Sequence, residues 1–473
     1  MVCLSQSFIS SCLASFGDLI MSARSDRHWP KLVQDTMQGF LRFNTTVFKA
    51  SPALVRCAVE RRPPTPLELR TLFESLGTTY IKLGQFIASS PSFFPADYVA
   101  EFQHCLDRTP NLPFELIANI IESELGGALQ QTFRSVNPEP IASASIAQVH
   151  AGILLDGREV VLKVQKPAVE QIINTDLNTA FLVARTLEIV SPVLTKSAIT
   201  DIIEELHQSM IDECDFIKEA NNLATFNAFI TDNQIESVFA PRPIPAASTR
   251  RLLTMDRVYG QPITQLSNRD SSIKTLNQQA LLNALHVWFL SLTQCSFFHG
   301  DLHSGNMLVE PNGRVAFIDF GMVGQIDASI WVAVLDLYRG ISEADLDAIA
   351  GAMVSIGMTK RLVDRALLAE DLGAVFDLDV NLAGVRLDSE GSLEKSAQRQ
   401  LSALLSVATR HGIRFPSAFT LLLKQLLYFD RYLDLLAPGT DLFNGDFFDF
   451  GSLGLSDFDQ TLGDAPIPKR PLS

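Results

Sequence analysis

The spacing of apolar residues predicts a change of local structure within the first half of the chain. A helical pattern runs from Leu67 through Ser90, after a break that contains several prolines. From Phe133 the pattern becomes a series of short extended segments, and Asp156-Gly157 predicts a hairpin turn into a strand at 159–164. The expected order is therefore a helical extension, then strand, loop, strand, turn and strand.

Helical periodicity returns after these strands. Two long helical stretches are expected, roughly from Ala168 to Val190 and from Ser197 to Phe229. Short extended pieces follow at 241–244 and 251–258. Residues 1–60 precede all of this and read as one or two amphipathic helices of obscure role. A chain of 473 residues is too long for one compact core, so several structural units are expected.

Beyond Gly260 the chain is predicted to be mainly helical to about Leu436, with a β-rich segment at 307–317. The last run, from Phe419, is apolar but is interrupted by charged and amide side chains. Charges are costly in a bilayer, so this run predicts a buried helix rather than a membrane span. The acidic, Phe-containing tail at 438–473 has no periodicity and is expected to be solvated or loosely draped, with a docking peptide as the alternative.

Composition identifies a folded protein and argues against one kind of partner. Hydrophobic residues make up 47% of the chain and charged residues 19%, as in globular proteins. The 38 basic and 53 acidic residues leave a net charge of −15, which repels phosphate backbones, so nucleic acid is not an expected partner. An anionic nucleotide would need local cations, backbone amides and a divalent metal.

Cysteine usage and the N-terminal residues bear on the compartment. The six cysteines are scattered and never stand at CxxC spacing, so neither a zinc site nor a disulfide framework is predicted. This favours the cytoplasm or another reducing compartment. The stretch from Phe8 to Met21 is short, contains Asp18 and follows no Lys or Arg, so no signal peptide or transmembrane helix is predicted there.

The strongest chemical signal is a pair of motifs, His299-Gly300-Asp301-Leu302-His303-Ser304-Gly305-Asn306 and Ile318-Asp319-Phe320-Gly321. An Asp with an Asn five positions later and a DFG after a short hairpin is typical of phosphoryl transfer. Asp301 is expected to orient or deprotonate the acceptor, while Asn306 and Asp319 hold Mg²⁺ on the phosphates. Each residue alone would more simply belong to a turn, but the three at this spacing favour catalysis.

A second signal is Lys163, in the apolar segment Val160-Val161-Leu162-Lys163. It matches the strand lysine that contacts nucleotide phosphates and pairs with a helix glutamate. A lysine on such a strand can also protect a sheet edge from aggregation. Its position after a small-residue loop and upstream of Asp301 favours the nucleotide role.

With these residues, the chain resembles the UbiB/AarF/ADCK family of atypical protein-kinase-like ATPases and kinases, from about Leu67 to Leu436. The family's motifs appear as Lys82-Leu83-Gly84-Gln85 (KxGQ), Ala142-Ser143-Ala144-Ser145-Ile146-Ala147 (the alanine-rich loop) and Glu213-Cys214-Asp215 (ExD). The resemblance assigns Glu219 as the partner of Lys163. Three departures stand in this chain: Ser304 replaces a usual proline, Ala147 a common glycine and Ser143 an alanine.

The resemblance implies an α+β, two-lobed protein-kinase-like fold with a helical N-terminal extension. The implied division is a segment of unclear role at 1–60, the KxGQ extension at 61–130, a small β-containing N-lobe at 131–260, a mainly helical C-lobe at 261–437 and the tail at 438–473. Catalytic roles fall to Asp301, Lys163, Glu219 and Asn306, and metal binding to Asn306 and Asp319. The residues expected at the nucleotide are Ala142, Ser143, Ala144, Ser145, Ile146, Ala147, Lys163, Met255, Asp256, Lys82, Gln85, Glu213 and Asp215.

The expected function is Mg-ATP binding with hydrolysis or transfer of the γ-phosphoryl group, so the cofactors are ATP and Mg²⁺. By resemblance, the setting is isoprenoid-quinone or other prenyl-lipid metabolism, with a prenyl lipid or quinone precursor and quinone-biosynthesis proteins as partners and peripheral membrane contact. One alternative is a small-molecule kinase of the aminoglycoside or choline type. Another is a nucleotide-binding scaffold without turnover.

Overall fold

The computed structural model describes a large part of the chain. These residues are 60, 65–89, 96–102, 110–190, 199–266, 271–343, 345–357, 363–383, 404, 407–408, 410–413 and 415–437. The helices predicted before residue 60 and the tail predicted at 438–473 lie outside them. The chain divides into two compact units, residues 1–80 with 168–209 and residues 81–167 with 210–473.

The described part of the first unit is helical. It contains α3 (Pro66–Leu76), α7 (Val169–Val190) and the first residues of α4 (Thr78–Ser89) and α8 (Ile199–Glu213). Thr65 begins α3 with a capping box, in which its hydroxyl accepts from the Glu68 amide and the Glu68 carboxylate accepts from the Thr65 amide. His207 of α8 bonds Asn174 of α7 at 2.6 Å.

The helical pattern predicted from Leu67 through Ser90 is confirmed, and it consists of two helices, α3 and α4. The first helix stops at Gly77, whose φ of +100° lies in a region that glycine adopts without strain, and α4 then begins at Thr78. Apolar periodicity continues across Gly77, so the sequence pattern alone does not reveal the break.

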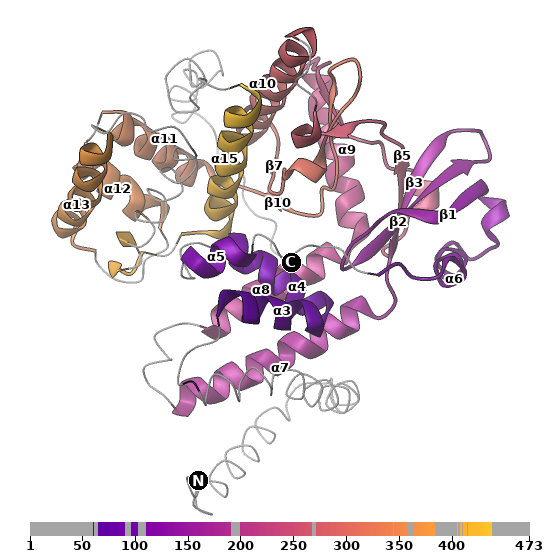
Figure 1. The fold of residues 1–473 in the computed structure, drawn as a ribbon, viewed down its shortest axis with the longest axis horizontal. Helices are drawn as coiled ribbons and strands as arrows, with labels where there is room; N and C mark the ends of the chain where they lie inside the picture. The colour runs from indigo at the N-terminus through magenta and orange to yellow at the C-terminus, as the bar shows by residue number, and fades with distance from the viewer. Residues whose placement is uncertain are drawn as a thin grey trace, which may run out of the picture. The chain divides into compact units, whose positions relative to one another are not determined.

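The sheet of the second unit has the strand order β1-β2-β3-β5 and is antiparallel throughout. Its strands are β1 (Phe133–Ser143), β2 (Ala147–Leu154), β3 (Glu159–Gln165) and β5 (Leu252–Asp256), so the strand pattern predicted from Phe133 is confirmed (Figure 1). Helix α6 (Phe114–Leu125) covers one face, where Ile117 and Ile121 pack with Leu162 and Val164. Alternation along β3 places Lys163 on the opposite face.

The helical stretch predicted from about Ser197 to Phe229 contains two helices within the described residues. α8 ends at Glu213, and α9 (Phe216–Asp232) begins after Asp215, whose carboxylate accepts from the Ile217 amide at 3.0 Å. An Asp at this position satisfies an amide that the helix leaves without an intrahelical partner. Because of this break, α9, whose first turn carries Glu219, need not continue the direction of α8.

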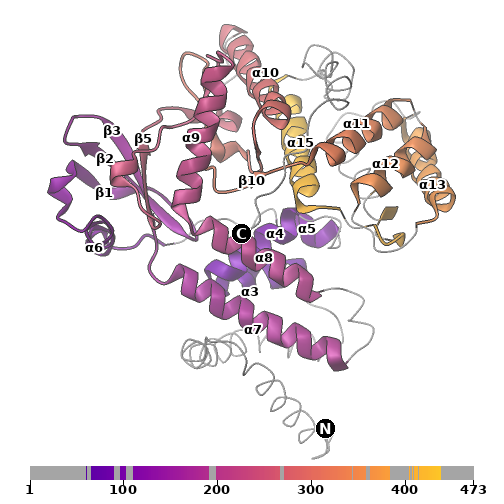
Figure 2. The ribbon, with the colours of Figure 1, turned by 180° about the vertical axis from the view of Figure 1, so that it is seen from behind.

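The remainder of the second unit is mainly helical, as predicted beyond Gly260 (Figure 2). Its helices are α5 (Ala96–Phe102), α10 (Ser271–Gln294), α11 (Ala328–Ser342), α12 (Leu346–Ile356), α13 (Arg365–Ala383) and α15 (Ser417–Leu436). Four short strands, β4 (Val238–Phe239), β9 (Val315–Phe317), β8 (Met307–Val309) and β6 (Gln261–Pro262), form a second sheet in that order. β7 (Phe298–His299) pairs with β10 (Val323–Gly324), and 3₁₀ turns occur at Leu129–Gln131, Pro245–Ala247, Ile263–Gln265 and Ser304–Asn306.

The core of the helical part is aromatic. Trp288 of α10 contacts Phe298 and Phe429, with ring centroids 6.0 and 5.3 Å apart. Phe429 and Leu433 make α15 part of this core, so the burial predicted for the run from Phe419 is confirmed. No helix within the described ranges combines the length and apolarity needed to cross a bilayer.

Candidate active site

Lys163 is the centre of a group of charges on the face of the sheet opposite α6. Its position in β3 lies between Val149 of β2 and Leu253 of β5. The ammonium donates to both oxygens of Glu219, each at 2.9 Å, and to Oδ1 of Asp319 at 3.0 Å. The predicted ion pair with Glu219 is therefore confirmed, although 56 positions separate the two residues.

The three side chains differ in exposure and in charge state. Lys163 is 15% exposed, Glu219 2% and Asp319 46%. Burial raises the pKa of Glu219 against the pull of Lys163. Burial is the largest single effect on Lys163 and on Asp319 and opposes the charge of each, but the neighbouring charges and hydrogen bonds together outweigh it. The pKa of Lys163 is therefore raised and that of Asp319 is lowered. Asp319 is thus the anionic group of the three that reaches toward solvent.

Asp319 is held in an uncommon backbone conformation. Its φ is +61°, in the left-handed region that few residues other than glycine adopt. The next residue, Phe320, is fully buried and packs against Phe226 and His299 at centroid distances of 4.9 and 4.6 Å. A side-chain carbon at Gly321 would stand 3.2 Å from Oδ1 of Asp319. The buried Phe320 ring holds this backbone conformation, and the lack of a side chain at Gly321 leaves room for the Asp319 carboxylate beside it.

His299 links the two halves of the motif pair. Its Nε2 donates to the Ile318 carbonyl at 3.1 Å, and its Nδ1 accepts from the Asp301 amide at 3.1 Å. Trp288 donates to the His299 carbonyl at 3.0 Å. Burial lowers the pKa of His299 to about 4, which keeps the ring neutral, so that one ring nitrogen donates a hydrogen bond while the other accepts one. His299 therefore has a structural role that fixes Asp301 relative to the segment before Asp319.

Asn306 and Asp319 have the chemistry that a magnesium ion requires. The Asn306 amide nitrogen donates to the Asp301 carbonyl at 2.9 Å, which leaves the oxygen end of the side chain to face a cation. Within the described ranges, no group of three or more His, Cys, Asp or Glu could hold a metal by itself. Mg²⁺ in nucleotide enzymes uses one or two protein oxygens with phosphate oxygens and waters, so this donor pair fits.

Helix α15 supplies two residues that sequence reasoning missed. Lys424 donates to Oδ1 of Asp301 at 2.8 Å. Gln425 is fully buried, accepts from the Leu302 amide and donates to the Gly300 carbonyl, each at 2.8 Å. In the sequence these two residues served only as polar interruptions of an apolar run. A charge and an amide inside a buried helix were the available signal, because buried polar groups require partners.

The KxGQ and ExD motifs meet in one ion pair. Lys82 of α4 is paired with Glu213 at the end of α8. Gln85 lies nearly one turn further along α4 and is half-buried. Asp215 caps α9 and lies 3.8 Å from Arg250, so its described contacts are structural rather than directed at Lys163.

The alanine-rich loop closes a tight turn between β1 and β2. The Ala144 amide donates to the Ala147 carbonyl at 2.8 Å, and Ser145 and Ile146 are buried. Lys166, a residue that sequence reasoning missed, donates from its backbone to Ile146 and from its ammonium to the Ser143 hydroxyl at 2.9 Å. The loop is therefore anchored to the end of the strand that carries Lys163. Ala142, the remaining alanine-rich position, pairs with Val149.

The two β5 residues expected at the nucleotide differ in direction. Met255 pairs with Val161 and lies on the same face of the sheet as Lys163. Asp256 pairs with Val160 and lies on the opposite face. Met255 is buried in the hydrophobic core. The Asp256 amide donates to the Arg242 carbonyl at 3.0 Å, which joins β5 to the segment that precedes it in the chain.

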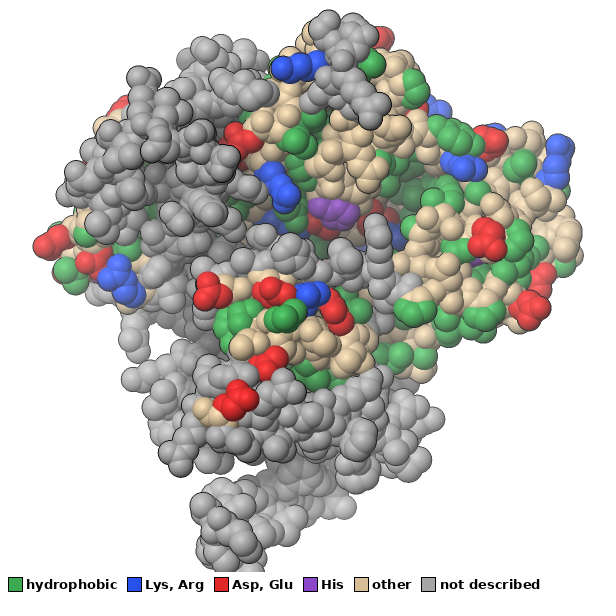
Figure 3. All heavy atoms as spheres, viewed as in Figure 1, with side chains coloured by type: hydrophobic (Ala, Val, Ile, Leu, Met, Phe, Trp, Pro, Cys, Tyr) green, Lys and Arg blue, Asp and Glu red, His purple; other side chains and the backbone are tan. Residues whose placement is uncertain are grey.

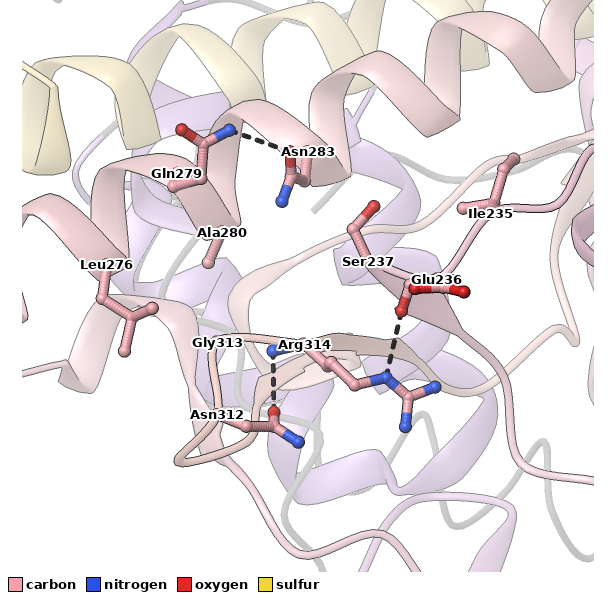
Figure 4. Close-up of a pocket in the computed structure, with 10 residues that line it drawn as sticks. All are labelled: Ile235, Glu236, Ser237, Leu276, Gln279, Ala280, Asn283, Asn312, Gly313 and Arg314. Carbon is pink, nitrogen blue, oxygen red and sulfur yellow. Dashed lines mark hydrogen bonds between the residues drawn. The ribbon is translucent and has the colours of Figure 1, made fainter.

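Charged groups rather than cavity size identify this site. Figure 3 shows acidic, basic and His side chains gathered in a recess on one face of the molecule. A separate open cavity of about 710 Å³ lies where α10 faces β4 and the turn between β8 and β9, and includes Gln279, Asn283 and Arg314 (Figure 4). None of the predicted catalytic residues lines it.

Comparison with known proteins agrees with this geometry. Residues 104–353 match the family described as the ABC1 atypical kinase-like domain. An uncharacterized aarF domain-containing protein kinase of Arabidopsis thaliana, named as chloroplastic, is 41% identical over 395 residues, covering 80% of this chain and 73% of that protein. An uncharacterized protein of Clostridium pasteurianum, from the hydrogenase 1 5′ region, is 30% identical over 381 residues, covering 79% and 68%.

A solved Mycobacterium tuberculosis structure, titled as a complex with erythromycin, aligns with a TM-score of 0.47 at 21% identity, over 82% of this chain and 98% of that one.

The strand lysine with its helix glutamate, followed by the Asp-Asn and Asp-Phe-Gly motifs, defines an atypical kinase-like protein of mixed α+β fold. The chain belongs to the ABC1 family, which includes the aarF, UbiB and ADCK proteins. The resemblance found in the sequence is thus confirmed.

The neutral state of His299 predicts a pH dependence of stability. The unfolded residue binds a proton from about pH 6.5 downward and the folded residue only near pH 4, so the unfolded state holds more protons between these values. The contribution of His299 to the free energy of unfolding should fall by about 3 kcal/mol as the pH drops through this window. NMR titration of the His299 ring measures the pKa directly, and a midpoint near 6.5 would contradict the assignment.

The shared ion pair predicts energetic coupling. Lys163→Met leaves the buried Glu219 without its cation, and Glu219→Gln leaves Lys163 with Asp319 as its one remaining carboxylate in the cluster, so each should lower the free energy of unfolding by about 3 kcal/mol. The double variant should lose less than the sum of the two. Denaturant unfolding of all four proteins tests this, and additive losses would show that the pair is not coupled in solution.

Proposed function

We propose that this protein binds Mg-ATP and hydrolyses it or transfers its γ-phosphoryl group. The observation that carries the proposal is the ammonium of Lys163 between Glu219 and Asp319, one buried carboxylate and one exposed. A cation oriented by a buried carboxylate suits phosphate oxygens. The exposed carboxylate suits a metal ion bound to those phosphates.

Each side chain then has a distinct task. Lys163 binds phosphate oxygens while Glu219 orients it. Asn306 and Asp319 would hold Mg²⁺, which neutralises charge on the transferred group when bound. Asp301 orients the acceptor hydroxyl or water and accepts its proton. Met255 and the alanine-rich loop, residues 142–147, offer contacts to the base and the phosphates.

The biological setting is proposed on resemblance. Family members suggest prenyl-lipid or isoprenoid-quinone metabolism, with a lipid or quinone precursor and quinone-biosynthesis proteins as partners at a membrane surface. The division into an extension at 61–130, an N-lobe at 131–260 and a C-lobe at 261–437 belongs to the same proposal. We further propose a reducing compartment, on the cysteine usage.

Two substitutions separate binding from turnover. Asp319→Asn removes an anionic metal ligand and should weaken Mg-dependent ATP binding at least about tenfold. Asp301→Asn should leave binding nearly unchanged and lower turnover about 100-fold, because it acts on the acceptor. Calorimetric titration and phosphate release, with and without Mg²⁺, measure both. Binding without turnover in the unsubstituted protein would instead support a scaffold.

The alanine-rich loop should limit closure over the phosphates. Glycine at position 144 would remove a methyl group from the turn and widen the allowed backbone angles. Ala144→Gly is therefore expected to raise ATP affinity relative to ADP affinity, at a stability cost of about 0.5–1 kcal/mol. Titration with both nucleotides tests this beside thermal unfolding, and lower stability with an unchanged affinity ratio would leave the loop a packing role only.

A further inference from the structure

Helix α15 contacts three consecutive residues of the catalytic motif, Gly300, Asp301 and Leu302. Gln425 bonds the backbone of Gly300 and Leu302, and Tyr432 donates to the Leu302 carbonyl at 3.3 Å. Lys424 reaches the residue between them and donates to the Asp301 side chain at 2.8 Å. The helix thus contacts both the backbone of the motif and its acidic side chain.

The Lys424 contact is a partly buried charge pair. Lys424 is 12% exposed and Asp301 27%. The ammonium also lies over the ring of Tyr428, 5.6 Å from its centroid. His303, two positions after Asp301, is 48% exposed, and its Nε2 stands 3.9 Å from Oδ2 of Asp301. Lys424 is therefore the close cation on Oδ1, while Oδ2 faces a more exposed neighbour.

Attachment of the motif to α15 does not require this charge. Gln425 and Tyr432 already provide three hydrogen bonds to the backbone of residues 300–302. Burying an ammonium group costs free energy that a carboxylate partner offsets only with good geometry. An apolar side chain at position 424 would hold the helix in the core at lower cost, so the charge points to a role in chemistry.

We propose that Lys424 is the positioning residue for Asp301 in phosphoryl transfer. By engaging Oδ1, Lys424 fixes the rotation of the carboxylate and leaves Oδ2 to accept the hydrogen bond of the acceptor hydroxyl or water. Charge-assisted hydrogen bonds are short and directional, which suits this task. The inference rests on the proposed phosphoryl-transfer function and assigns it a residue from outside the two motifs at 299–306 and 318–321.

Kinetics of Lys424 variants test the positioning role. Lys424→Met should lower kcat about 100-fold, as expected for a misplaced reacting group, with Mg-ATP affinity and KM for ATP unchanged within about twofold. Lys424→Arg keeps the charge and should recover most of kcat. Lys274→Met, which removes an exposed lysine of α10, is the matched control and should behave as the unsubstituted protein. A kcat within about twofold of the unsubstituted value for Lys424→Met would overturn the proposal.

A second measurement does not depend on activity. Lys424→Met leaves the Asp301 carboxylate without its close cation, and Asp301→Asn leaves the Lys424 ammonium without its carboxylate. Each should therefore lower the thermal unfolding midpoint, and the double variant should lower it by less than the sum. Additive shifts would show that the pair does not form in solution and would overturn the inference while leaving Mg-ATP turnover intact. Absence of both Mg-ATP binding and turnover in the unsubstituted protein would instead reject the proposed function, and the positioning role with it.

Discussion

The ammonium of Lys163 between two carboxylates is the interaction on which the rest of the site depends. One partner, Glu219, is buried in the first turn of α9, and the other, Asp319, follows β9 and remains partly exposed. Charges taken out of water remain stable only with well-placed partners. The sheet, α9 and the motif at 318–321 are thereby held at one point, and each of them must be in place for the lysine to be satisfied.

Several neighbouring features follow from this constraint. Asp319 adopts a positive φ to present its carboxylate, and the buried ring of Phe320 holds that conformation. His299, kept neutral by burial, joins Asp301 to the same segment. Strained backbone conformations persist only where the surrounding packing holds them. Such strain and buried polar contacts of this kind concentrate at functional sites. The observed arrangement agrees with membership of a kinase-like family.

Local patterns in the sequence predicted the parts of the structure that depend on local interactions. The strands after Phe133 and the burial of helix α15 were anticipated in this way. The pairing of Lys163 with Glu219, 56 positions apart, was anticipated through resemblance to a family. Helix breaks at Gly77 and at Asp215 were missed, because apolar periodicity continues across a single capping residue. The contact of Lys424 with Asp301 spans 123 positions, and no local spacing reveals a partner at that distance.

Hydrogen exchange with and without Mg-ATP tests the central claim most directly, namely that the Lys163 cluster is the nucleotide site. The account predicts slower exchange on addition of Mg-ATP in peptides that cover the alanine-rich loop, β3 and residues 299–321. Protection should be absent when Mg²⁺ alone is added. Unchanged exchange in these peptides, or protection confined to the cavity lined by Gln279, Asn283 and Arg314, would contradict it.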